Sequence, residues 1–177
     1  MAYTVTDRDR VFDGVKVKLE VHTVADDAGK SHTREVVVHG GAVLILGVNP
    51  EQEVLMIRVH RYPVGDHLWE LPAGTIEGPD DDPMQRAKLE LKEETGHDCG
   101  RIETLGSFYT SPGILTERMH CFVATDLTAG EQALEEGEDI TVHPMPLAEA
   151  LAKIDAGEIV DGKTIAALLM YARKVGT

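Results

Sequence analysis

Three glutamates near the middle of the chain have the residue type and spacing of a metal-binding helix face. Glu90, Glu93 and Glu94 stand at i, i+3 and i+4, so a helix would project their carboxylates from one face within a turn. Like charges placed in this way repel each other by about 0.2–0.5 kcal/mol per pair, which a hard divalent cation would offset. Mg²⁺ takes oxygen ligands and is held by carboxylates together with substrate phosphates. The spacing alone leaves a solvated acidic helix face as the alternative.

The residues around this cluster predict the helix that must carry it. Asp82 can cap its N-terminus, Pro83 suits the first helical position, and Gly96 ends it. Between these residues, side chains suited to one buried face recur at helical spacing, at Met84, Ala87, Leu91 and Thr95. The preceding segment, 74–82, is rich in Gly, Pro and Asp and is predicted to be a loop.

The same stretch resembles the box of the Nudix hydrolases, G-x5-E-x7-R-E-U-x-E-E-x-G-U, in which U is aliphatic. The residues E-L-K-E-E-T-G at 90–96 match its second half at each specified position, and W-E-L-P-A-G at 69–74 is the usual lead-in. This resemblance implies two or three Mg²⁺ ions, with Mn²⁺ as a substitute. It makes Glu90 and Glu94 metal ligands together with the backbone carbonyl of Ala73, while Glu93 shares or orients the second metal site.

A second acidic segment follows the box and completes the site that the resemblance implies. Matching the family's E-x-E-D-I onto residues 136–140 offers Glu136 as the general base and Glu138 as the metal-linked residue. Glu93 and Glu94 join Glu136 as the candidate catalytic residues. A solvated acidic turn is the alternative reading of this segment, because five acids crowd residues 131–139.

The box departs from its pattern in three places. From Gly74 to Gly96 it is one residue longer, and the predicted helix start places the extra residue in the loop. The first Glu has no counterpart, although Asp80 and Asp81 stand near its place, and Leu89 occupies the position of the usual Arg. Arg86 lies four residues before Glu90 on the same helical face and is a candidate replacement cation. An ordinary i,i+4 surface pair with Glu90 is the alternative.

Outside the box, the chain resembles the ADP-ribose pyrophosphatase branch of the family. The segments that carry this likeness are G-S-F-Y-T-S-P-G-I-L-T-E at 106–117, L-E-E-G-E-D-I at 134–140 and D-G-K-T-I from position 161. The likeness implies Mg²⁺-dependent hydrolysis of ADP-ribose, or of a related nucleoside diphosphate sugar, to AMP and a sugar phosphate such as ribose 5-phosphate. The substrate-binding residues that it suggests are Arg61, Glu70, Ser111, Gly113 and Glu117.

Two other functions fit parts of the same sequence. GDP-mannose or another nucleoside diphosphate compound would use the same metal site with a different base pocket. A catalytically weak Nudix-fold ADP-ribose sensor is favoured by Leu89 and by the altered first Glu of the box. Retention of the box glutamates argues against the sensor, because binding alone does not need so many like charges in one place.

The remaining patterns predict the fold that positions these residues. Alternating or apolar runs indicate strands at 15–21, 34–39, 42–48, 54–59, 68–71, 102–109, 119–124 and 140–142. Helical periodicity returns over 147–174, with a break near Gly157 and a new cap at Asp161. The order favours α/β (α+β) architecture, and the resemblance specifies a Nudix fold: a mixed β-sheet sandwiched between helices, with an N-terminal antiparallel β-lobe.

Two segments with different tasks are expected along the chain. Residues 1–40 are predicted to form the β-lobe, and residues 41–177 the Nudix hydrolase domain. In related pyrophosphatases such a lobe exchanges between the subunits of a homodimer and helps to clamp the adenine, so we expect a homodimer formed through this lobe. Phe12 is the only aromatic residue from 11 to 39, which argues against an adenine clamp of aromatic side chains. A self-contained hairpin packed on its own core is the alternative.

Composition limits the partners and the compartment. The 177 residues carry 31 acidic and 17 basic side chains, a formal charge of −14, which disfavours nucleic acid polymers and anionic membrane surfaces. The expected partner is a small nucleoside diphosphate sugar, to which metal ions can attach an acidic protein. Two cysteines, a polar N-terminus and the lack of a long apolar run favour the cytoplasm.

Overall fold

The computed structural model describes residues 2–78 and 80–176, which divide between two compact units. Unit 1 comprises Met1–Gly41 and Tyr109–Arg118, and unit 2 comprises Ala42–Phe108 and Met119–Thr177. The roles expected of residues 1–40 in dimerisation and substrate binding stay predictions.

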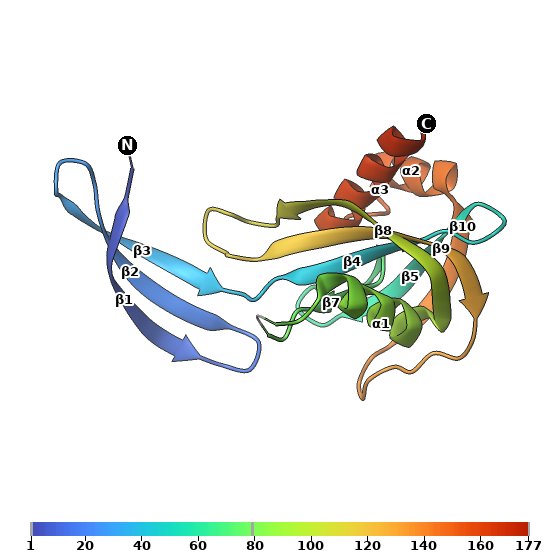
Figure 1. The fold of residues 1–177 in the computed structure, drawn as a ribbon, viewed down its shortest axis with the longest axis horizontal. Helices are drawn as coiled ribbons and strands as arrows, with labels where there is room; N and C mark the ends of the chain where they lie inside the picture. The colour runs from blue at the N-terminus through green and yellow to red at the C-terminus, as the bar shows by residue number, and fades with distance from the viewer. Residues whose placement is uncertain (1, 79, 177) are drawn as a thin grey trace. The chain divides into compact units, whose positions relative to one another are not determined.

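Unit 1 is built on an antiparallel sheet with the strand order β1-β2-β3 (Figure 1). Its strands are β1 (Thr4–Asp13), β2 (Lys18–Ala25) and β3 (Ser31–Val38). Asp26 forms the turn between β2 and β3 by accepting hydrogen bonds from the backbone N–H groups of Ala28 at 2.9 Å and Lys30 at 3.0 Å. The sequence reading missed β1, whose ten residues are all exposed and carry no burial period.

Unit 2 contains two further sheets. One has the order β7-β4-β9-β8, with β4 parallel to β9, and the other is antiparallel with the order β10-β5-β6. The strands are β4 (Ala42–Gly47), β5 (Glu53–Arg61), β6 (Asp66–Glu70), β7 (Ala73–Thr75), β8 (His97–Tyr109), β9 (Arg118–Ala129) and β10 (Ile140–Pro146). The short β7 overlaps the first two residues of the predicted loop at 74–82, and it pairs with β4 along Ala73–Thr75.

Alternate residues of β4 enter two different cores, which explains why this strand is buried on both faces. Leu44 and Leu46 pack in the cluster that includes residues of α2 (Leu147–Asp155) and α3 (Gly162–Val175). Val43 and Ile45 pack in the cluster of α1 (Pro83–Thr95). Helices therefore cover the mixed sheet on both sides, as Figure 1 shows, and the predicted fold class is confirmed.

The predicted caps set the ends of α1. The Asp82 side chain accepts a hydrogen bond from the Met84 backbone N–H at 2.9 Å, and Pro83 occupies the first turn. Gly96 ends the helix in the left-handed region, at φ 73°, and donates its N–H to the carbonyl of Lys92. These local interactions fix the register of the helix, and therefore the face on which its glutamates lie.

Unit 2 contains both cysteines of the chain. Cys99 is half-buried, Cys121 is buried, and both are free thiols. Burial raises the pKa of Cys121 to about 12, so this thiol stays protonated at neutral pH. Among the helices of the described residues, none combines the length and the apolar character needed to cross a membrane.

Candidate active site

Helix α1 places Glu90 directly against strand β7. A Cβ atom added to Gly74 would overlap the Glu90 carboxylate, so this approach requires glycine. Arg86, one turn earlier, contacts the same carboxylate, with its Nη2 2.5 Å from Glu90 Oε1. Burial raises the pKa of Glu90, although the charge of Arg86 opposes the shift.

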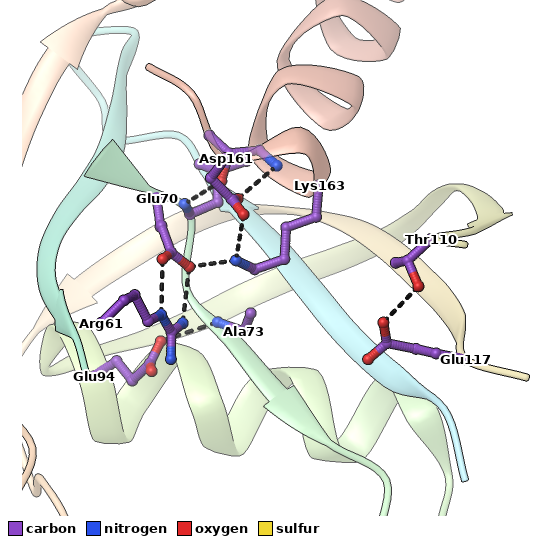
Figure 2. A network of polar contacts seen from close by, with 10 residues as sticks. Arg61, Glu70, Ala73, Glu94, Thr110, Glu117, Asp161 and Lys163 are labelled. Carbon is purple, nitrogen blue, oxygen red and sulfur yellow. Dashed lines mark hydrogen bonds and ion pairs between the residues drawn. The ribbon is translucent and has the colours of Figure 1, made fainter. Parts of the chain in front are cut away.

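Glu94 lies one turn further along the same helix face. The residue is 6% exposed, and its Oε2 accepts a hydrogen bond from the Ala73 backbone N–H at 2.9 Å (Figure 2). Burial raises the pKa of Glu94 from its ordinary value of 4.5 to about 8, and the charges of Glu90 and Glu138 add to the rise. At neutral pH without a cation, this carboxyl is therefore mostly protonated.

The late acidic segment begins against the C-terminal end of α1. The Gln132 side chain donates to the Glu94 carbonyl at 2.6 Å, and the Ala133 N–H donates to the Glu93 carbonyl at 2.9 Å. The side chain of Glu93 is half-buried, and its charge contributes to raising the pKa of Glu90. Hydrogen bonds to the backbone of α1 thus connect the late acidic segment to the helix that carries the box glutamates.

Farther along this segment, the two candidate loop residues differ in their surroundings. Glu138 is exposed and accepts a hydrogen bond from the Glu135 N–H at 2.8 Å, yet its charge contributes to the raised pKa of Glu90 and Glu94. Glu136 is exposed on a turn that continues through Gly137 at φ 90°. Glu138 is therefore in electrostatic range of the box glutamates, and Glu136 is accessible to solvent.

These carboxylates do not form a ready-made metal cage. Among residues 2–78 and 80–176, no three His, Cys, Asp or Glu side chains converge closely enough to hold an ion. The contacts above give the reason, because Glu90 faces Arg86, Glu94 faces the Ala73 N–H and Glu138 folds onto its own loop. Metal binding would require the Glu94 and Glu138 side chains to exchange partners, whereas Arg86 contacts Glu90 through Oε1.

A second network holds Arg61 beside the Glu94 region. Arg61 forms a bidentate pair with Glu70, with its Nε 2.7 Å from Oε1 and its Nη2 2.8 Å from Oε2. Lys163 contacts Glu70 Oε2 from the start of α3 and also lies 2.9 Å from Asp161 Oδ1 (Figure 2). The sequence analysis named Arg61 and Glu70 but missed Lys163. The D-G-K run at the start of the last helix is the sequence feature that could have indicated this lysine.

The charges of this network determine which groups remain ionised. Burial would raise the pKa of Glu70, but hydrogen bonds and charge from Arg61 and Lys163 outweigh it and lower the pKa overall. The Arg61 pKa is raised, chiefly by its hydrogen bonds to Glu70 and also by the charge of Glu94. Glu70 is only 1% exposed, so the geometry favours its acting through Arg61.

The N-terminus of α3 is also tied to the segment that leads into β7. The buried Thr164 side chain accepts a hydrogen bond from the Leu71 N–H at 2.9 Å. Asp161 caps the helix by accepting from the Thr164 N–H at 3.0 Å. The sequence reading missed Thr164, because a buried threonine leaves no pattern of its own.

The remaining substrate-binding candidates belong to unit 1. The Ser111 carbonyl accepts from Ile114 and Leu115, which forms a tight turn around Gly113. Glu117 accepts a hydrogen bond from the Thr110 hydroxyl at 2.6 Å (Figure 2). The structure describes these contacts within unit 1, and a common site with the box glutamates stays a proposal.

Unit 2 thus carries an acidic helix packed on a mixed sheet that helices cover on both faces. The sequence model of the NUDIX domain matches residues 38–168, and the chain belongs to that family. A solved structure described as an ADP compounds hydrolase shares the fold, with a TM-score of 0.88 and 19% identity over 99% of this chain and 95% of that one.

Curated relatives cover most of the chain. A methanol dehydrogenase activator from Bacillus methanolicus is 38% identical over 90% of this chain and 87% of its own length. An ADP-ribose pyrophosphatase from Bacillus subtilis is 35% identical over 91% and 88%. A GDP-mannose pyrophosphatase from Citrobacter koseri is 38% identical over 76% and 74%. These similarities support a Nudix hydrolase.

Proposed function

We propose that this protein hydrolyses the diphosphate bond of ADP-ribose to AMP and ribose 5-phosphate with the aid of divalent cations. The observation that carries the proposal is the pair of buried carboxylates, Glu90 and Glu94, held on α1 against β7. Arg61 lies near enough for the charge of Glu94 to affect its pKa. The similarity to an ADP-ribose pyrophosphatase over most of both chains supports the choice of substrate.

The donor set fits a hard cation. Glu90, Glu93 and Glu94 offer carboxylate oxygens, and Mg²⁺ prefers oxygen ligands. The raised pKa of Glu94 shows that an ionised carboxylate is costly there without a positive charge nearby. We propose that these glutamates, the Ala73 carbonyl and Glu138 hold two or three Mg²⁺ ions, for which Mn²⁺ can substitute.

The protein's own residues then have separate tasks in the reaction. When bound, the metal ions neutralise the diphosphate and lower the pKa of a water molecule. Glu136 accepts a proton from the attacking water, a bond forms from the water oxygen to one phosphorus, and the anhydride P–O bond breaks. Arg61, held by Glu70, contacts the phosphate that leaves and stabilises its negative charge.

GDP-mannose is the second candidate substrate. A relative with that printed activity is 38% identical over 76% of this chain, and the box glutamates would serve either diphosphate. The comparison to make is kcat/KM for ADP-ribose and GDP-mannose, with product identification. We expect ADP-ribose to be preferred and Glu94→Gln to abolish turnover of both. A much higher kcat/KM for GDP-mannose would overturn the choice of substrate.

We also propose that unit 1 pairs with a second copy of the chain in the cytoplasm. Apolar side chains that are exposed on β1 and on the segments beside it support this, because exposed apolar patches mark protein–protein interaction sites. These side chains are Tyr3, Val5, Val11, Phe12, Val15 and Val17. Light scattering of the purified protein should give the mass of a dimer, and Phe12→Asp should shift it toward the monomer. A monomeric wild type would contradict the proposal.

A further inference from the structure

The position at which the Nudix pattern expects arginine holds Leu89, which is 50% exposed. This side chain lines a surface cavity of about 180 Å³ at the N-terminal half of α1. Arg86, one turn earlier on the same helix, lines the same cavity together with Glu77. Positions 86 and 89 therefore border one space.

Arg86 is held more closely than an ordinary surface arginine. Its side chain is 23% exposed and that of Glu90 is 8% exposed, with 2.5 Å between Nη2 and Oε1. The Arg86 Nε is buried without a hydrogen-bond partner in the described part of the chain. Burial lowers the Arg86 pKa, but the charge of Glu90, the hydrogen bond to Glu90 and the charges of Glu93 and Glu77 together outweigh burial, and the pKa is raised overall. The local carboxylates thus stabilise a cation that burial opposes.

Glu90 is in turn confined on two sides. The absence of a side chain at Gly74 lets its carboxylate lie against β7, and Arg86 holds its Oε1 from the helix side. A carboxylate fixed through one oxygen can offer the other to a cation without first losing rotamer freedom. Arg86 therefore has the contact needed to orient a metal ligand.

We propose that Arg86 is a positioning residue for Glu90 and that this protein has moved the orienting guanidinium of its carboxylate helix by one turn, from position 89 to position 86. Arg86 acts on cation binding through the orientation of Glu90. The consequence for turnover rests on the proposed function, whereas the consequence for cation binding does not.

The test compares Arg86→Ala with a control variant on the same helix. Lys92→Ala removes the same charge from an exposed side chain that pairs with Asp98 at 3.0 Å. Binding of Mn²⁺ is measured by electron paramagnetic resonance of the free ion, and kcat and KM are measured with ADP-ribose. We expect Arg86→Ala to weaken Mn²⁺ binding or to lower kcat at saturating Mg²⁺ by about 10–100-fold, with KM for ADP-ribose nearly unchanged. Lys92→Ala should resemble the wild type.

A second-site variant tests the position of the guanidinium. Arg86→Ala combined with Leu89→Arg returns a guanidinium to the same cavity and should recover a large share of the loss. Wild-type Mn²⁺ binding and wild-type kcat in Arg86→Ala would overturn the proposal, and so would a double variant no better than Arg86→Ala. If Arg86→Ala does not fold, Arg86→Lys replaces it and should show a smaller loss; no loss would overturn the proposal.

The two proposals fail in different ways. A wild type that binds Mn²⁺ but does not hydrolyse ADP-ribose would contradict the proposed function. The Mn²⁺ affinities of the wild type and the Arg86 variants would still decide the role of Arg86.

Discussion

Glu94 should make the metal-free protein less stable as the pH rises. Its folded pKa of about 8 lies above the ordinary value of 4.5, so the folded state retains a proton that the unfolded chain releases. Its contribution to stability is fully present below pH 4.5 and is lost as the pH rises through 8. Glu94→Gln keeps the shape and the acceptor for the Ala73 N–H but cannot ionise.

The size of the effect follows from the two pKa values. At about 1.4 kcal/mol for each pH unit between them, the largest possible loss is about 5 kcal/mol. Between pH 5 and pH 9 it amounts to about 4 kcal/mol for this group alone. Structural relaxation and solvent around an ionised Glu94 would reduce this figure, so it is an upper value.

Urea unfolding from pH 5 to pH 9 in the presence of a chelator measures this loss. The wild type should become less stable relative to Glu94→Gln as the pH rises, and Mg²⁺ should restore the wild type but not the variant. Glu51→Gln, on an exposed turn, is the control and should follow the wild type. Parallel curves for the wild type and Glu94→Gln would refute the reasoning.

Four other variants test the rest of the site. Gly74→Ala should destabilise the fold by about 1–3 kcal/mol in urea unfolding and weaken Mn²⁺ binding, because the new Cβ would displace the Glu90 carboxylate; wild-type behaviour would contradict the packing. Glu70→Gln should lower folding stability by about 2 kcal/mol and raise KM, because Arg61 loses an ionised partner. This cost is smaller than that of breaking a fully buried ion pair, because the Arg61 side chain is 40% exposed. Glu136→Gln should lower kcat by about 10²–10⁴-fold and leave Mn²⁺ binding intact. Glu138→Gln should weaken Mn²⁺ binding. The reverse pattern would make Glu138 the general base and Glu136 the metal ligand.

The helix that carries the box glutamates was predictable because its signals are local. Asp82, Pro83 and Gly96 act within one or two turns of the residues that they cap, so their effect can be read from spacing. The pairing of Arg86 with Glu90 was also within reach, because i,i+4 neighbours meet on any helix. The burial of this pair could not be predicted from the helix alone, since it depends on packing against β7.

Contacts between distant segments left weaker signals. Lys163 meets Glu70 only because α3 packs near the end of β6, and no periodicity reports that contact. Strand β1 was missed for a different reason, since a strand exposed along its whole length has no apolar alternation to detect. The sequence thus predicted residues fixed by local geometry or by family resemblance better than those fixed by tertiary packing.

The most direct test of the central claim is hydrolysis of ADP-ribose in ¹⁸O-labelled water, with mass spectrometry of the products. We predict AMP and ribose 5-phosphate, with one ¹⁸O atom in the phosphate that was attacked, only when Mg²⁺ or Mn²⁺ is present and not with Glu94→Gln. A wild type that binds ADP-ribose and Mg²⁺ but forms no labelled product would contradict the account and favour a sensor.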